Sequence, residues 1–248
     1  MVQAPITPQN LYPDSDGKPM ADNTEQYRWI AQLVTNLKHL LRDQTAFVAG
    51  DLLWYPVEVE PGETPPRQAP DVMVALGRPA GYRGSYQQWK EANIAPQVVF
   101  EILSPSNTTT EMAAKQAFYL QHGALEIYFY NPQSRKFWGL VRRSVTDAPR
   151  SLTATDLPWV SPCLQIRFEQ ARGGELAVFY PDGKPFKEPE DFVQGEAQAQ
   201  AERDQAQVER DQAQAERDQA QAERNQAQAE RDRLAAKLRD LGINPDNL

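Results

Sequence analysis

Three ionisable side chains lie in or beside apolar segments, where a charged group is unfavourable unless a partner compensates it. Glu101 is inside the apolar run "QVVFEIL", Asp71 begins "DVMVAL", and Lys115 is in the segment that follows Glu101. Two carboxylates on neighbouring strands can share a hard divalent cation such as Mg²⁺, which prefers oxygen ligands. A nearby ammonium group can orient or polarise a water molecule that attacks a phosphate. These residues therefore predict metal-assisted hydrolysis of a phosphate ester.

Each of the three residues also has an ordinary structural interpretation. Glu101 could be the buried partner of an Arg or Lys, and Asp71 could begin a strand or cap a turn. Lys115 is four residues after Glu111, so the two could form an ion pair on an exposed helix face. The position of the Lys115 side chain distinguishes the two interpretations. A lysine that faces the two carboxylates favours an enzyme, and a lysine in bulk solvent does not.

Other kinds of catalytic site find little support in the sequence. The chain has two histidines and one cysteine, which is too few for a histidine-rich metal site, a zinc cluster or an internal disulfide. The segment "SPSN" after Leu103 lacks the Gly-x-Ser-x-Gly elbow of a serine nucleophile. No Walker loop, dinucleotide fingerprint or EF-hand loop appears. The enzymatic options therefore narrow to metal and carboxylate chemistry.

The charge distribution limits how the protein can bind nucleic acid. The formal net charge is -8. Residues 196–248 contain 12 acidic and 8 basic side chains, and residues 1–195 contain 22 acidic and 18 basic side chains. Each part is thus net acidic, which argues against coating nucleic acid by bulk electrostatics. Any nucleic-acid contact must come from a local basic patch, or from metal ions that neutralise an acidic site.

The elements that must position the site indicate a mixed α/β domain over residues 22–190, preceded by an extended arm over residues 1–21. Apolar residues at helical spacing after Asp22 or Asn23, either of which could be the N-cap, predict an amphipathic helix. A second helix is expected over residues 109–122, closed by Gly123. Candidate strands are "AFVAGDLLWYPVE", "DVMVAL", "QVVFEIL" and "EIYFYN", with a later antiparallel extension at "KFWGLVRR", "LQIRF" and "LAVFY".

Residues 191–248 have a different pattern, with a seven-residue repeat of the type "QAQAERD". No Pro or Gly interrupts residues 196–241, and Ala, Gln, Glu and Arg favour helix, so one long helix is expected. Its heptads place Gln and Ala where a strong coiled coil has large apolar residues. Only Leu234, Leu238 and Leu241 form an apolar stripe. Weak self-association, packing onto the rest of the chain and a solitary solvated helix all remain open.

The segment between the two acidic strands, residues 77–96, is long for a simple connection. Its basic residues alternate with aromatic ones, a composition suited to contacting phosphates and stacking on bases. The equally plausible alternative is that the aromatic rings only pack the segment onto the domain. The residues concerned are Arg78, Tyr82, Arg83, Tyr86, Trp89 and Lys90.

The location of the protein is predicted from what the sequence lacks. No apolar stretch approaches the roughly 18 residues that cross a bilayer. The start, "MVQAPITPQN", has neither a basic cluster nor an apolar core typical of a secretory signal. A cytoplasmic protein that does not contact membrane is expected.

Several of these residues together resemble a known family. "APD" at 69–71, "VVFEILSPSN" at 98–107, Lys115 with "FY" following, and "HGALEIYFYNP" at 122–132 are similar to the "putative restriction endonuclease" family that is expanded in cyanobacteria. That family is a branch of the PD-(D/E)XK nuclease superfamily. The resemblance covers residues 20–185 and extends to the repeat tail with its Leu-Gly-Ile-Asn-Pro ending.

The resemblance implies a restriction-endonuclease-like α/β (α+β) core, with a mixed central sheet flanked by helices. It also implies that Asp71 and Glu101 bind the metal, with the Ile102 carbonyl as a third protein ligand. In the parent motif a lysine stands two residues after the second acidic residue, where this chain has Leu103. Lys115 on the following helix is the match for that lysine. Glu25 matches an additional acidic residue of many relatives, although it could equally complement the start of its helix.

The prediction is an Mg²⁺-dependent endonuclease, with Mn²⁺ able to substitute, that hydrolyses DNA phosphodiester bonds. Asp71 and Glu101 hold the cation, Lys115 positions the attacking water, and Glu25 assists a second ion. Because cutting both strands is simplest with two active sites, a homodimer is expected, with the C-terminal helix as one possible contact. Two alternatives remain: a catalytically silent nuclease fold that recruits partners through its coiled coil, and a related enzyme that acts on RNA.

Overall fold

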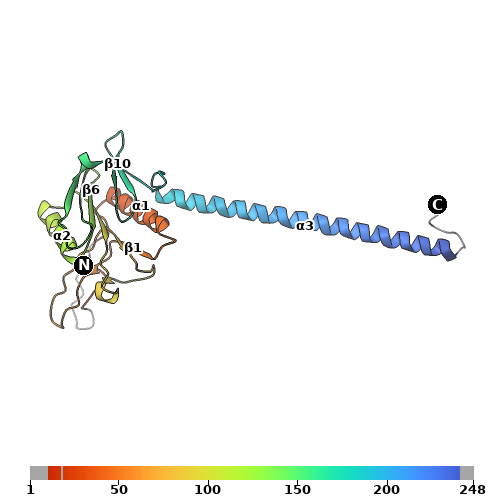
Figure 1. Cartoon of the computed structure of the whole chain (residues 1–248), viewed down its shortest axis with the longest axis horizontal. Helices are drawn as coiled ribbons and strands as arrows, with labels where there is room; N and C mark the ends of the chain where they lie inside the picture. The colour runs from red at the N-terminus through yellow and green to blue at the C-terminus, as the bar shows by residue number, and fades with distance from the viewer. Residues whose placement is uncertain (1–10, 18, 241–248) are drawn as a thin grey trace. The chain divides into compact units, whose positions relative to one another are not determined.

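The computed structural model describes residues 11–17 and 19–240. The chain divides into two compact units, residues 1–189 and residues 190–248. Residues 11–17 and 19–21 of the arm predicted at residues 1–21 are thus described, and residues 1–10 and 18 lie outside the described range. The first unit is a mixed α+β domain built on a central sheet (Figure 1), which confirms the predicted fold class.

The central sheet has six strands in the order β1-β3-β5-β6-β7-β8. β5 and β6 are parallel and every other neighbouring pair is antiparallel, so the sheet is mixed. β5, which contains Glu101, lies inside the sheet and all five of its residues are buried. The strand bounds are β1 Ala46–Gly50, β3 Val72–Leu76, β5 Val98–Ile102, β6 Glu126–Asn131, β7 Lys136–Val141 and β8 Arg150–Thr153.

Two helices cover the sheet and pack into two different apolar clusters (Figure 1). α1 (Thr24–Leu40) begins after Asn23, whose side chain accepts a hydrogen bond from the Gln26 N–H. α2 (Thr109–His122) is capped by Thr108 and ends at Gly123, whose positive φ of 113° favours glycine. Both helices form where capping residues and apolar spacing predict them.

The alternation of side chains along each strand decides which helix a residue faces. On β5, Phe100 and Ile102 belong to the cluster with α1, whereas Val99 belongs to the cluster with α2. Glu101 is two residues from Val99 and therefore lies on the α2 side. Asp71 is two residues from Met73, which also packs on the α2 side. Both predicted carboxylates thus face the helix that contains Lys115.

Smaller sheets complete the first unit. β9 (Trp159–Val160), β10 (Arg167–Gln170) and β11 (Leu176–Phe179) form an antiparallel sheet in the order β11-β10-β9. Phe168 and Val178 of this sheet join the apolar cluster of α1. β2 (Trp54–Tyr55) pairs in parallel with β4 (Tyr86–Gln87), and the 3₁₀ helices η1 (Gln88–Lys90) and η2 (Ala154–Asp156) lie in connections.

Glu126, at the start of β6, is a second fully buried carboxylate. It accepts hydrogen bonds from the backbone N–H of Cys163 and from the hydroxyl groups of Tyr128 and Ser161. These neutral donors satisfy the carboxylate without a cation and attach the segment before β10 to the central sheet. Glu126 therefore has a structural role.

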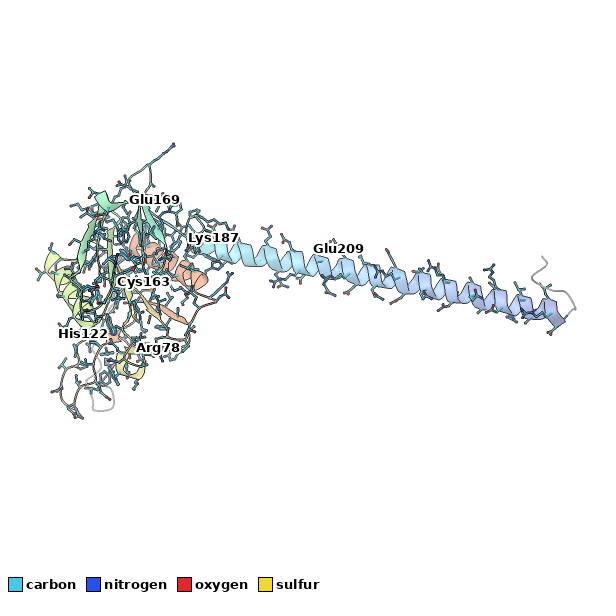
Figure 2. The ribbon with its side chains drawn as sticks, in the orientation of Figure 1. Arg78, His122, Cys163, Glu169, Lys187 and Glu209 are labelled. Carbon is cyan, nitrogen blue, oxygen red and sulfur yellow. The ribbon has the colours of Figure 1, made fainter. Side chains whose placement is uncertain are left out.

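The second unit contains α3 (Pro189–Asp240), one uninterrupted helix of 52 residues. Gln side chains donate to acidic groups one turn ahead, as in Gln205 to Glu209 at 3.0 Å; Glu209 is labelled on the helix in Figure 2. Val208 and Leu234 are 51% and 59% exposed, and Leu241 of the predicted stripe lies outside the described residues. Self-association through α3 stays a prediction. No described helix is both long and apolar enough to cross a membrane.

Candidate active site

The centre of the candidate site is a pair formed by Glu101 and Lys115. Nζ of Lys115 lies 2.7 Å from Oε2 of Glu101, and the two side chains are 15% and 2% exposed. Burial raises the pKa of Glu101, and the positive charge of Lys115 only partly offsets that rise. Burial also lowers the pKa of Lys115, but the carboxylates of Glu101 and Asp71 outweigh it, so the net shift is upward. Lys115 therefore points to the two carboxylates and not to bulk solvent.

Tyr119 fixes the other oxygen of Glu101. Its hydroxyl donates a 2.5 Å hydrogen bond to Oε1, and the residue is fully buried. Lys115 and Tyr119 are four residues apart on α2, so their side chains lie on the same face of the helix. The Tyr119 ring stacks on Trp54 with an interplanar angle of 3°. Both carboxylate oxygens of Glu101 thus have a partner of defined position, and Tyr119 is a site residue that sequence reasoning did not identify.

Asp71 lies beside the same pair, immediately before β3. Its Oδ2 accepts a 2.6 Å hydrogen bond from the backbone N–H of Ile102, and its exposed fraction is 8%. Burial raises its pKa well above the ordinary value, and the charge of Glu101 adds to that rise, while Lys115 opposes it. Asp71 and Glu101 are therefore close enough to repel each other electrostatically.

The Ile102 carbonyl, the predicted third ligand, belongs to the same cluster. It accepts a 2.8 Å hydrogen bond from Nε2 of Gln26 on α1. A carbonyl oxygen has two lone pairs, so this bond leaves one acceptor position. Gln26 is itself buried, and its Oε1 accepts from the Asp22 N–H at 2.8 Å. The amide of Gln26 therefore links the start of α1 to the end of β5.

The structure does not bring Glu25 into this cluster. Its side chain is 50% exposed and pairs with Arg28 at 2.9 Å, on the first turn of α1. Successive residues of an α-helix point about 100° apart, because one turn takes 3.6 residues. When Gln26 faces Ile102, Glu25 must face elsewhere. Glu25 thus lies outside the cluster, its role at a second ion stays an untested prediction, and Gln26 is the residue of α1 that reaches the site.

Asp51 is an additional carboxylate that sequence reasoning missed. It follows β1 with a φ of 46°, and its backbone N–H donates to the Asp71 carbonyl at 3.2 Å. Burial raises the pKa of Asp51 to about 6, with the charges of Asp16 and Glu101 adding to the rise and Lys115 opposing it. No local motif marks this residue. Only the pairing of β1 with β3 places it beside Asp71.

Gln26, Asp51, Asp71 and Lys115 line a pocket of about 430 Å³. Lys115 is the only basic side chain among the described residues that line it. Its acidic lining residues come from the N-terminal arm, the ends of β1 and β3, and α2: Asp16, Asp22, Asp51, Asp71 and Glu111. The pocket therefore has a strongly negative wall close to the Glu101–Lys115 pair.

The donor set fits a hard divalent cation. Asp71, Glu101 and the Ile102 carbonyl provide oxygen atoms only, which is the ligand type that Mg²⁺ prefers. Burial raises the pKa of Asp71, and the charge of Glu101 adds to the rise; a bound cation would oppose that shift. Within residues 11–17 and 19–240, no three His, Cys, Asp or Glu side chains form a metal-binding cluster. A cation here would consequently rely on two carboxylates and a carbonyl.

The aromatic residues of the 77–96 segment mostly pack onto the domain. Tyr86 is fully buried, and the Trp89 ring lies 4.8 Å from that of Tyr12. Arg78, labelled in Figure 2, and Arg83 both pair with Glu91, at 2.8 and 2.6 Å. Tyr82 differs from the other two aromatic residues, because it is 93% exposed. Of these three aromatic residues, Tyr82 is therefore the one whose exposed ring could stack on a base.

Comparisons with known proteins find a family and a solved structure that are similar to this chain. The Uma2 family, described as "Putative restriction endonuclease", matches residues 15–178. A crystal structure described as a putative nuclease belonging to DUF820 from Anabaena variabilis ATCC 29413 is similar at 16% identity and a TM-score of 0.44. The similarity covers 61% of this chain and 81% of that one. No curated protein matches the chain.

Proposed function

The chain belongs to the Uma2 family of putative restriction endonucleases, and from that premise we propose that it is a metal-dependent endonuclease that hydrolyses DNA phosphodiester bonds. The observation that supports this most directly is the 2.7 Å contact between Lys115 and Glu101, beside a second buried carboxylate. This contact supports the proposal because it brings an ammonium group beside the second acidic residue of the motif, although Lys115 stands at a different sequence position from the lysine of the parent motif.

Asp71, Glu101 and the Ile102 carbonyl are the groups that would hold Mg²⁺ or Mn²⁺. When bound, such a cation activates water and stabilises negative charge on a phosphate. The chain's own residues supply the rest. The Lys115 ammonium can donate hydrogen bonds to a water molecule and to a phosphate oxygen, which positions one against the other. Tyr119 and Lys115 hold Glu101 in a single orientation, so little reorganisation is required.

The main rival is a catalytically silent nuclease fold that acts as a binding scaffold. A Lys115 side chain in bulk solvent would favour that role, since the site would then lack its cationic group. Its side chain is instead 15% exposed and bonded to Glu101. The geometry thus favours the enzyme, while α3 remains available for partner binding in either case. A homodimer that places two sites on opposite strands is part of the proposal.

A cleavage assay tests the proposal. Supercoiled plasmid should convert to nicked and then linear DNA when Mg²⁺ or Mn²⁺ is present, and EDTA should stop the conversion. A folded RNA of similar length should be cut more slowly under the same conditions. If plasmid stays intact with either metal over a wide range of protein concentration, the proposal is contradicted. Faster cleavage of the RNA would indicate that RNA, and not DNA, is the substrate.

A further inference from the structure

β1 is the terminal strand of the central sheet, and no strand among the described residues pairs with its outer edge. The Thr45 carbonyl accepts from the Gly77 N–H, and the Asp51 N–H donates to the Asp71 carbonyl. In an antiparallel pair, hydrogen-bonded residues alternate with residues whose N–H and C=O point the other way. Ala46, Val48 and Gly50 therefore direct their backbone groups away from β3.

A groove of about 600 Å³ runs along β1. β1 provides its floor, the end of α1 provides one wall, and residues 80–83 provide the other. The charged side chains among the described residues that line it are all basic: Lys38, Arg42 and Arg83. The groove therefore combines cations with outward-facing backbone N–H groups, which is a combination that binds phosphate oxygens.

Two of these cations are available to a ligand. Lys38 is exposed. The Arg42 side chain is 59% exposed, contacts the more exposed Asp43 through Nε, and contacts the exposed His39 ring through Nη1. Exposed contacts of this kind are weak. Arg83 is held by Glu91 and by the Phe47 ring, 4.1 Å from its guanidinium carbon. Arg83 thus forms part of the wall, and Lys38 and Arg42 are the movable charges.

The groove is continuous along the chain with the candidate active site. Gly50 lines the groove, and the next residue, Asp51, lines the acidic pocket. The acidic pocket repels phosphates when no cation is bound, and the whole chain has a net charge of -8. DNA that reaches the pocket must therefore be held by positive charge nearby.

We infer that the β1 groove binds the sugar–phosphate backbone of DNA next to the bond that is cut. Lys38 and Arg42 pair with phosphates, and the N–H groups of Ala46, Val48 and Gly50 donate to phosphate oxygens. Tyr82, at the rim, packs against the sugar or base beside them. Because these contacts are made to the sugar–phosphate backbone, they provide affinity for DNA of any base sequence. The inference rests on the proposed function and assigns its substrate-binding surface.

The test separates binding from chemistry by steady-state plasmid cleavage with the full chain. The double variant Lys38→Gln/Arg42→Gln should raise KM by about tenfold or more, and the salt dependence of log(kcat/KM) should weaken by about 0.9 per lost phosphate contact. Because neither side chain lines the acidic pocket, kcat should stay close to that of the unaltered chain. Tyr82→Ala should raise KM alone.

The matched control is Lys136→Gln/Arg143→Gln, which removes the same charge from exposed positions on and just after β7. Unfolding temperatures of all variants should agree. Equal KM values for the groove and control variants, with the unaltered chain active, would overturn the groove assignment alone. No cleavage by the unaltered chain would overturn the proposed function and the groove with it. If sedimentation shows that only the groove variant dissociates into monomers, the groove is a subunit contact and the inference is wrong.

Discussion

Lys115 and Glu101 form a direct 2.7 Å ion pair, although they lie 14 residues apart on α2 and β5. The pair links a helix to an inner strand of the sheet at the mouth of an acidic pocket. Breaking such a pair by removing one partner leaves an uncompensated buried charge, which typically costs about 3–5 kcal/mol. Variants at this site must therefore be compared for stability as well as for cleavage.

Removing the Tyr119 hydroxyl should affect both properties. Tyr119→Phe deletes the hydrogen bond to Oε1 of Glu101, so the free energy of unfolding should fall by about 1.5–3 kcal/mol. Cleavage should slow by about 10- to 100-fold, because Glu101 loses a group that orients it. The control is Tyr86→Phe, whose hydroxyl donates to the Ile94 carbonyl at 2.8 Å. It should lose stability and keep its cleavage rate, and equal rates for the two variants would contradict the role of Tyr119.

A lysine at position 103, where the parent motif has one, should partly replace the function of Lys115. Lys115→Met should slow cleavage by about 10²- to 10⁴-fold. Leu103 continues the strand beyond β5, since its N–H donates to the Tyr130 carbonyl, and its side chain packs on the α2 side as Glu101 does. A lysine at position 103 would therefore point to the same side, and Leu103→Lys should restore part of the activity of Lys115→Met. Leu103→Met in the same background should restore none. Identical rates for the two double variants would show that the ammonium does not act at this place.

Stability should depend on pH through Asp51. Its folded pKa of about 6 exceeds the ordinary value of 3.8, so the folded protein binds more protons than the unfolded chain between these values. The contribution of Asp51 to stability therefore decreases as pH rises through this window and remains lost above it. The raised pKa of Asp71 acts in the same direction. Urea unfolding should show that Asp51→Asn gains stability over the unaltered chain above pH ~6, and gains little near pH ~4.

A divalent cation should reverse this loss of stability. Because the carboxylates must be deprotonated to bind metal, Mn²⁺ should raise the unfolding temperature above pH ~6 more than it does near pH ~4. Asp71→Asn should reduce the effect of the metal at the higher pH. An equal rise in unfolding temperature at both pH values would indicate binding elsewhere on the chain.

Self-association through α3 is a separate prediction. The exposed large apolar side chains of α3 among the described residues are Val193, Val208 and Leu234. Val208 lies at a seam position, and the other seam positions are mainly Gln and Ala. The double variant Val208→Glu/Leu234→Glu should weaken a dimer that forms through α3, as measured by sedimentation over a range of concentrations. It should also shift plasmid products from linear to nicked DNA. If dimerisation is unaffected, the contact lies on the first unit and α3 is a solvated helix.

The parts of the fold that the sequence predicts best are those with local signals. Thr108 and Gly123 mark both ends of α2, and short runs of apolar residues mark β5 and β6. The short strands β4 and β9 have two residues each, too few for a recognisable period. They depend on neighbours distant in sequence, so single-sequence reasoning did not find them.

Some site residues could likewise be identified from their own segment, whereas others are brought to the site only by tertiary packing. Glu101, Asp71 and Lys115 were identifiable because each is unusual for its segment or matches a family motif. Gln26 and Asp51 are ordinary surface residue types in their own segments. Strand order brings Asp51 to Asp71, and the rotation of α1 selects Gln26 over Glu25. Both are consequences of tertiary packing, which no local pattern records.

The most direct test of the central claim compares two buried glutamates that receive the same substitution. Glu101→Gln alters the Lys115 partner, whereas Glu126→Gln alters a carboxylate held by Cys163, Ser161 and Tyr128. Plasmid cleavage in Mg²⁺ should be measured at a temperature where both variants are folded. The proposed site predicts that Glu101→Gln, like Asp71→Asn, loses cleavage, and that Glu126→Gln retains it. Undiminished cleavage by Glu101→Gln and Asp71→Asn would contradict the site.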